Sequence, residues 1–208
     1  METVSDTREF WLTKLTARLR PVFEAAGYTL PEKIRSSCGF PSRSALATKA
    51  RRVGEAWSCE LSADSFFETF VSPLVSDGLE VAAIQVHELV HVAVGLKCGH
   101  RGKFSKCAKA LGLVGKMKVT EAGEELKVRL QTIIDVLGPY PHAKLMKSNA
   151  PPKQGTRMLK IECPLCGYTC RSTKKWLEVG VPTCPCGTKM VGPDLDDEED
   201  GEDYDANT

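Results

Sequence analysis

Residues His87-Glu88-Leu89-Val90-His91 form an HExxH motif. It lies within a segment from about Asp77 to Gly95 that is apolar on nearly every side, which predicts a central buried helix. Residues four positions apart share one helical face, so both imidazoles can reach a single Zn²⁺. Glu88 is placed to take a proton from a zinc-activated water rather than to bind the metal.

A third protein ligand is expected, because a catalytic zinc usually has three and keeps one position open. We favour His100, since three of the four histidines fall between positions 87 and 100 and the glycines beside it let the chain turn back. The metzincin spacing fails, because that position is Lys97. The open alternatives are carboxylates, and His142 is interpreted as structural. The candidate carboxylates are those of Glu121, Glu124 and Glu125.

A second metal site is predicted near the C-terminus. The segments Cys163-Pro164-Leu165-Cys166-Gly167 and Cys184-Pro185-Cys186-Gly187 are typical of a zinc ribbon, in which two short turns hold one structural zinc. Such a module has almost no core, so metal binding would supply most of its folding energy. Cys170 either replaces one of the four ligands or packs.

The remaining pattern predicts an α+β fold. A first helix is expected from Asp6, with Glu9 completing a capping box, and further helices at about 103–111 and 120–137. Strands are expected at 33–38, 52–61 and 66–71 and would form a small sheet. We therefore predict a mostly helical, zincin-like metalloprotease domain (1–147), a linker (148–157), a zinc ribbon (158–193) and a disordered acidic tail (194–208).

Charge is segregated along the chain. The net charge is +1, from 28 basic and 27 acidic residues, but residues 194–208 hold nine acids and no base. The rest of the chain is strongly basic, which favours a polyanionic partner, and the alternative is a solubilising charge excess. In the ribbon Arg171, Lys174 and Lys175 offer phosphate contacts beside the stacking surface of Trp176. DNA is therefore an expected partner.

The expected location is the cytoplasm, or the host cytoplasm if the chain is phage-encoded. The first residues lack the pattern of a signal peptide, and no apolar run approaches the ~20 residues that cross a bilayer, so we expect no membrane partner. Without an export signal the nine cysteines are interpreted as reduced thiols or metal ligands. The oligomeric state stays open at this stage.

The order of these parts resembles the SprT-like zinc metallopeptidase family, in its phage and bacterial form with a C-terminal zinc ribbon. The similarity covers about residues 55–190 and includes Phe70-Val71-Ser72-Pro73, the HELVH motif, Gly99-His100, a basic helix, a Gly-Pro-Tyr-Pro-His segment (138–142) and the ribbon. It implies the zinc ligands His87, His91 and His100 and the catalytic residue Glu88. Eukaryotic members of this family are DNA-dependent proteases that degrade proteins crosslinked to DNA, so the resemblance implies a similar activity here. A glycine of the family's Gly-His-Gly-x-x-Phe run is shifted in Arg101-Gly102-Lys103-Phe104, and the acidic tail is long.

We therefore expect a zinc-dependent endopeptidase that cleaves DNA-associated protein substrates and holds one catalytic and one structural Zn²⁺. The alternative is a non-catalytic, zinc-containing nucleic-acid-binding or transcription-associated protein, in which Cys98 or Cys107 would close the histidine site. Glu88 discriminates between the two, because a closed structural site has no use for that carboxylate.

Overall fold

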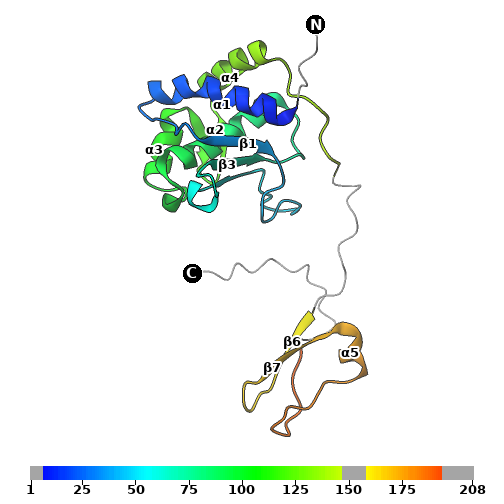
Figure 1. Ribbon diagram of the computed structural model, residues 1–208. Coiled ribbons are helices and arrows are strands. Elements are labelled where there is room, and N and C mark those ends of the chain that lie inside the picture. Colours follow the sequence, from blue (N-terminus) through cyan, green and yellow to red (C-terminus); the bar gives the residue numbers. More distant parts are fainter. Residues whose placement is uncertain (1–6, 147–157, 194–208) are drawn as a thin grey trace. The chain divides into compact units, whose positions relative to one another are not determined.

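The computed structural model describes residues 7–146 and 158–193 (Figure 1). The predicted linker (148–157) and acidic tail (194–208), like Asp6, lie outside these described residues. The chain divides into two units, Met1–Ala150 and Pro151–Thr208, and each is described by itself. Helices and small sheets are both present, so the expectation of a mixed α+β fold is confirmed. Among the described residues no helix combines the length and apolar character that a bilayer crossing needs.

Within residues 7–146, the described part of the first unit, there are four α-helices, five short strands and two 3-10 turns. In chain order they are α1 (Arg8–Ala25), β1 (Ile34–Cys38), β2 (Gly54–Trp57), η1 (Cys59–Leu61), β3 (Phe67–Val71), α2 (Gly78–Val94), η2 (Leu96–Cys98), α3 (Lys103–Ala110), β4 (Leu113–Lys116), β5 (Val119–Ala122) and α4 (Glu124–Leu137).

Strand β3 is the centre of a three-stranded sheet with the order β1-β3-β2. Strand β1 runs parallel to β3, with Ile34 opposite Phe67, and β2 runs antiparallel to it, with Gly54 opposite Val71. All three strands were expected, although β2 is shorter than the predicted 52–61. It ends early because Ser58 caps the 3-10 turn η1 by accepting a hydrogen bond from the Glu60 backbone.

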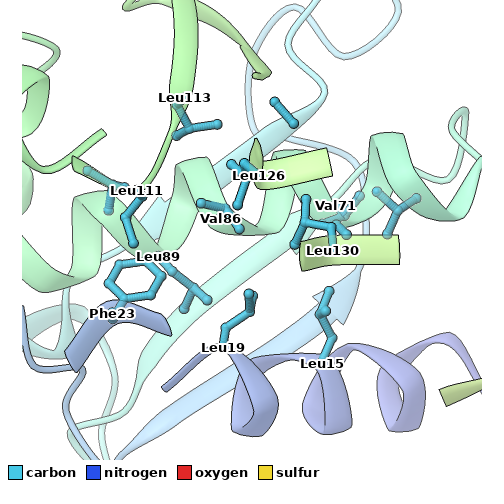
Figure 2. Close-up of a cluster of buried hydrophobic side chains, with 14 of the residues drawn as sticks. Leu15, Leu19, Phe23, Val71, Val86, Leu89, Leu111, Leu113, Leu126 and Leu130 are labelled. Carbon is cyan, nitrogen blue, oxygen red and sulfur yellow. The ribbon is translucent and has the colours of Figure 1, made fainter. Parts of the chain in front are cut away.

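The core lies where α2 meets the sheet, α1 and α4 (Figure 2). Helix α2 is the central buried helix that its composition predicts, with Asp77 capping its first turn and Gly95 following its last residue. Side chains from α1 and α4 close over it. The fully buried members labelled in Figure 2 include Leu15, Leu19 and Phe23 of α1, Val86 and Leu89 of α2, and Leu130 of α4.

A buried polar cluster joins α2 to three other elements. The side-chain amide of Gln85, which has no exposed surface, lies 2.8 Å from the hydroxyl of Ser36, 3.0 Å from that of Thr16 and 3.1 Å from that of Thr69. These hydroxyls come from β1, α1 and β3. Buried polar groups stabilise a fold only when they are paired, so the cluster favours one placement of α2 on the sheet.

The predicted capping box of α1 is wrong. The helix begins at Arg8, and the hydroxyl of Thr7 accepts a hydrogen bond from the backbone N–H of Phe10 at 3.1 Å. Glu9 does not turn back to a cap residue, because its carboxylate accepts a hydrogen bond from the backbone N–H of Cys38 in β1. A tertiary contact between α1 and the sheet therefore replaces the local one.

The predicted helix from Thr120 is also wrong in its first turn, because α4 begins at Glu124. Residues 119–122 form β5, which pairs antiparallel with β4 in a hairpin that the sequence analysis missed. Val119 and Thr120 are β-branched and suit a strand. At the base of the hairpin the backbone N–H of Gly123 donates a hydrogen bond to the carbonyl of Gly112 at 2.9 Å. This contact marks the end of β5, and α4 begins at the next residue.

The second unit has two antiparallel strands, β6 (Met158–Glu162) and β7 (Thr169–Thr173), followed by the short helix α5 (Lys174–Val179). Its core is small. The buried members are Ile161, Cys163, Leu177, Cys184 and Met190.

Candidate metal centres

Helix α2 presents the two histidines of the motif on one face. His87 and His91 are four positions apart, and their rings lie 5.2 Å from each other between centroids. His91 is buried and His87 is half-buried. Helix α2 is fixed by its N-terminal cap and by its buried apolar residues. It therefore places both imidazoles close together on the same face.

Three glycines bring His100 back to this point. Gly95, Gly99 and Gly102 all have positive φ, at 87°, 52° and 51°, a region that residues with a side chain rarely adopt. Gly95 and Gly99 flank the 3-10 turn η2, and Gly102 directly precedes α3, so the chain reverses between α2 and α3. The prediction that glycines allow this return is confirmed.

The three imidazoles converge through the same ring atom. Nε2 of His100 lies 3.2 Å from Nε2 of His87 and 3.2 Å from Nε2 of His91. The three ligand atoms lie within 4.8 Å of one another, so together they could hold a metal ion. Phe104 of α3 is fully buried under all three rings, at centroid distances of 4.4 to 4.9 Å.

The histidines are held in the neutral form that binds a metal. Burial lowers the pKa of His87 to about 4, and the charge of His100 acts in the same direction. Burial, followed by the charges of His87 and His100, lowers the pKa of His91 to about 3. Burial also lowers the pKa of His100, with the nearby cations Lys118 and Arg52 adding to the effect. A neutral imidazole keeps a free lone pair on one nitrogen, which is what a metal requires.

Glu88 lies against the first residue of β2. Only 6% of its surface is exposed, and a Cβ built on Gly54 would lie 2.4 Å from its Oε1 atom. Burial, with a smaller contribution from the charge of Glu55, raises the pKa of Glu88 to about 8. The carboxylate of the motif therefore occupies a confined place beside the sheet.

The structure brings a further residue to the site that the sequence analysis missed. The hydroxyl of Thr120 in β5 lies 2.7 Å from Nδ1 of His87. By contrast, Nδ1 of His91 is buried and has no hydrogen-bond partner among the described residues. Thr120 is 33 residues from His87 in the sequence, so no local pattern predicts their contact. Thr120 reaches His87 because it lies in a β-hairpin, where the sequence predicted a helix.

The other ligand candidates do not join the three histidines within the described part of the chain. Cys98 hydrogen-bonds to the carbonyls of Gly95 and Gly99, and Cys107 is buried in the core, where burial raises its pKa to about 12. His142 is exposed. The carboxylates Glu121, Glu124 and Glu125 lie at the end of β5 and the start of α4 and are absent from the group.

The second unit gathers four thiols that could hold a metal ion: those of Cys163, Cys166, Cys184 and Cys186. Sγ of Cys163 lies 3.6 Å from that of Cys186, and Sγ of Cys166 lies 3.5 Å from that of Cys184. The two glycines that follow these cysteine pairs make the tight turns. Gly167 and Gly187 have positive φ, and their N–H groups donate to the carbonyls of Cys163 and Cys184 respectively.

Cys170 packs beside this group and is not a member of it. Its Sγ lies 3.9 Å from the sulfur of Met190, in the small core. At the ligand position Cys186, hydrogen bonds from the side chain and backbone of Thr188 lower the pKa to about 6. A thiol that ionises readily suits a metal ligand, since the thiolate is the form that binds.

The predicted nucleic-acid contacts lie in the middle of β7 and on α5. Arg171, Lys174, Lys175 and Trp176 are all exposed, and Trp176 has 60% of its surface accessible. Nζ of Lys175 lies 5.3 Å from the centre of the Trp176 ring. A cation and an open aromatic face are therefore available side by side.

No family model, no curated protein and no solved structure matches this chain.

Proposed function

We propose that this chain is a cytoplasmic, zinc-dependent endopeptidase with a zincin-like fold, similar to the SprT-like family, that acts on DNA-associated proteins. The observation that carries the proposal is the gathering of three imidazole Nε2 atoms on the helix that also bears the confined carboxylate of Glu88. Catalytic zinc sites use three protein ligands and leave one position open, whereas structural sites use four. Among the described residues three side chains form this group, which favours the catalytic type.

Zinc fits the dimensions of both groups. Two nitrogens at zinc–nitrogen distances of 2.0–2.1 Å and a tetrahedral angle lie about 3.3 Å apart, close to the 3.2 Å that separates Nε2 of His100 from Nε2 of His87 and from Nε2 of His91. Two sulfurs at zinc–sulfur distances of about 2.3 Å lie about 3.8 Å apart, close to the 3.5 and 3.6 Å between the thiols. The donor sets, three histidines and four cysteines, are those that zinc prefers.

The roles of the residues follow from the donor geometry. His87, His91 and His100 would hold a zinc ion, which would supply a Lewis acid that polarises a carbonyl and makes a water molecule more acidic. The positive charge of that ion would lower the pKa of Glu88, so its carboxylate could take the proton of the water and deliver it to the nitrogen of the leaving amine as the peptide C–N bond breaks. Gly54 leaves room for the carboxylate, and Phe104 holds the three rings in place.

DNA recruitment is proposed for the second unit. Arg171, Lys174 and Lys175 would contact phosphates, and the exposed ring of Trp176 would stack on a base. This part of the proposal is also the basis of the rival function, a zinc-containing nucleic-acid-binding protein without catalysis. In the rival both metal sites would be structural, and Glu88 would have no chemical role.

The experiment compares wild type, Glu88→Gln and Glu80→Gln, each with its zinc content measured. Glu80 lies on the same helix but is exposed in its first turn, which makes it a matched control. Each protein is incubated with a DNA-binding protein substrate, with and without single-stranded DNA. We expect DNA-stimulated cleavage by wild type and Glu80→Gln, and its loss in Glu88→Gln with zinc retained.

Two results would contradict the proposal. Equal cleavage by Glu88→Gln and wild type would remove the catalytic role of the carboxylate. If wild type holds two zinc ions and binds DNA but cleaves nothing, the rival binding function is favoured.

A further inference from the structure

The hairpin β4–β5 is fixed against the core by close backbone contacts. Leu113 and Ala122, paired across its base, are both buried. A Cβ on Gly123 would lie 2.8 Å from the carbonyl oxygen of Gly112, so the two glycines allow an approach that other residues would prevent. The position of β5 is therefore determined by packing and not by its own exposed turn.

Strand periodicity turns Thr120 toward the core. Side chains two positions apart share one face of a strand, so Thr120 lies on the same face as the buried Ala122. Val119 and Glu121 lie on the opposite face and are exposed. Gly115, which has no side chain, is the cross-strand partner of Thr120.

On this buried face of β5, the hydroxyl of Thr120 contacts Nδ1 of His87, the ring nitrogen that is not directed at the other histidines. The Oγ1···Nδ1 distance is 2.7 Å, and Nε2 of the same ring points to His100 at 3.2 Å. Nδ1 of His91 has no hydrogen-bond partner among the described residues. Of these two helix histidines, His87 is the one whose ring plane is fixed by a hydrogen bond to the hairpin.

We infer that Thr120 is a positioning residue for the histidine metal site, holding His87 as the tautomer whose Nε2 lone pair faces the ion. A neutral imidazole carries one proton, so a ligand Nε2 requires the proton on Nδ1, which then donates to the hydroxyl oxygen of Thr120. This inference rests on the proposed metal site. The residue touches neither substrate nor metal and acts only through His87.

The test is the zinc affinity of the full chain carrying Thr120→Val, Thr120→Ser or Thr132→Val. Valine has nearly the same shape as threonine and suits a strand, but lacks the hydroxyl. Serine retains the hydroxyl. Thr132 is exposed on α4, and its hydroxyl donates a hydrogen bond to the carbonyl of Val128 in the same helix, so it provides a matched control. Competition with a chromophoric chelator gives the affinities, and Co²⁺ substitution separates the histidine site from the thiolate site by their spectra.

We expect Thr120→Val to weaken zinc binding at the histidine site by about 10- to 100-fold, with the thiolate site unchanged. Thr120→Ser should recover most of the affinity, and Thr132→Val should match wild type. Unchanged affinity in Thr120→Val would overturn the inference, provided that His87→Ala loses the ion. If His87→Ala keeps both ions, the metal site itself is wrong and the inference fails with it.

Discussion

Gly54 of β2 and Glu88 of α2 lie so close together that a side chain on the glycine would meet the carboxylate. An ideal Cβ on Gly54 would be 2.4 Å from Oε1 of Glu88 and 2.7 Å from a methyl carbon of Ile84. Glycine is required here by this close approach, since its φ is not in the left-handed region. The first residue of the edge strand thus limits where the carboxylate can go.

Gly54→Ala should therefore reduce peptidase activity by about a hundredfold while zinc content is unchanged. The added methyl group must displace Glu88, Ile84 or the strand, and such overpacking should lower the free energy of unfolding by about 1–3 kcal/mol. Turnover, bound metal and urea unfolding measure the three quantities. Gly78→Ala is the control, because its Cβ would make only ordinary contacts of 3.7 Å or more. Full activity in Gly54→Ala would show that the carboxylate has room to spare.

Gln85→Met should destabilise the first unit by about 1–3 kcal/mol. Methionine has a similar length but offers no N–H groups to the hydroxyls of Thr16, Ser36 and Thr69, which are buried with it. Urea unfolding followed by far-UV circular dichroism gives the change. Gln131→Met on the exposed face of α4 should stay within about 0.5 kcal/mol of wild type. Equal stabilities of the two variants would mean that the buried cluster contributes nothing specific.

Cys166→Ser and Cys170→Ala should differ in metal content. Cys166 belongs to the four-thiol group, so its loss should release the ion of the second unit. Cys170 contacts Met190 and stands outside the group, so Cys170→Ala should retain the ion. Metal content per chain, measured by atomic emission after dialysis, distinguishes the two. Loss of metal in Cys170→Ala with retention in Cys166→Ser would exchange their assignments.

Removing the metal should unfold the second unit and leave the first unit folded. Within residues 158–193 the core cluster of the second unit has five buried residues, whereas the first unit has an extensive core around α2. Structural zinc supplies folding free energy to modules of this kind. Amide signals of residues 158–193 in a ¹⁵N-correlated spectrum should lose their dispersion in excess chelator and recover when zinc is restored. Unchanged dispersion in a metal-free sample would show that the thiol group does not need an ion.

The local parts of the fold were predictable because their signals lie within a few residues. The apolar pattern between Asp77 and Gly95 defines α2 almost to its ends, and the three strands of the sheet were located. The errors occurred where a distant partner competes with a local one. Glu9 bonds to β1 instead of capping its own helix, and Thr120 pairs in a hairpin instead of opening α4.

Because helix periodicity is local, the amino-acid sequence alone predicts that His87 and His91 share a helical face with Glu88 beside them. It also determined that paired cysteines followed by glycines form two tight turns. The tertiary structure decided which residues join them. It selected His100 over the carboxylates of Glu121, Glu124 and Glu125, placed Thr120 behind His87, and set Gly54 against Glu88. These contacts depend on chain reversals and on packing between elements far apart in the sequence, and no periodicity within a single element encodes them.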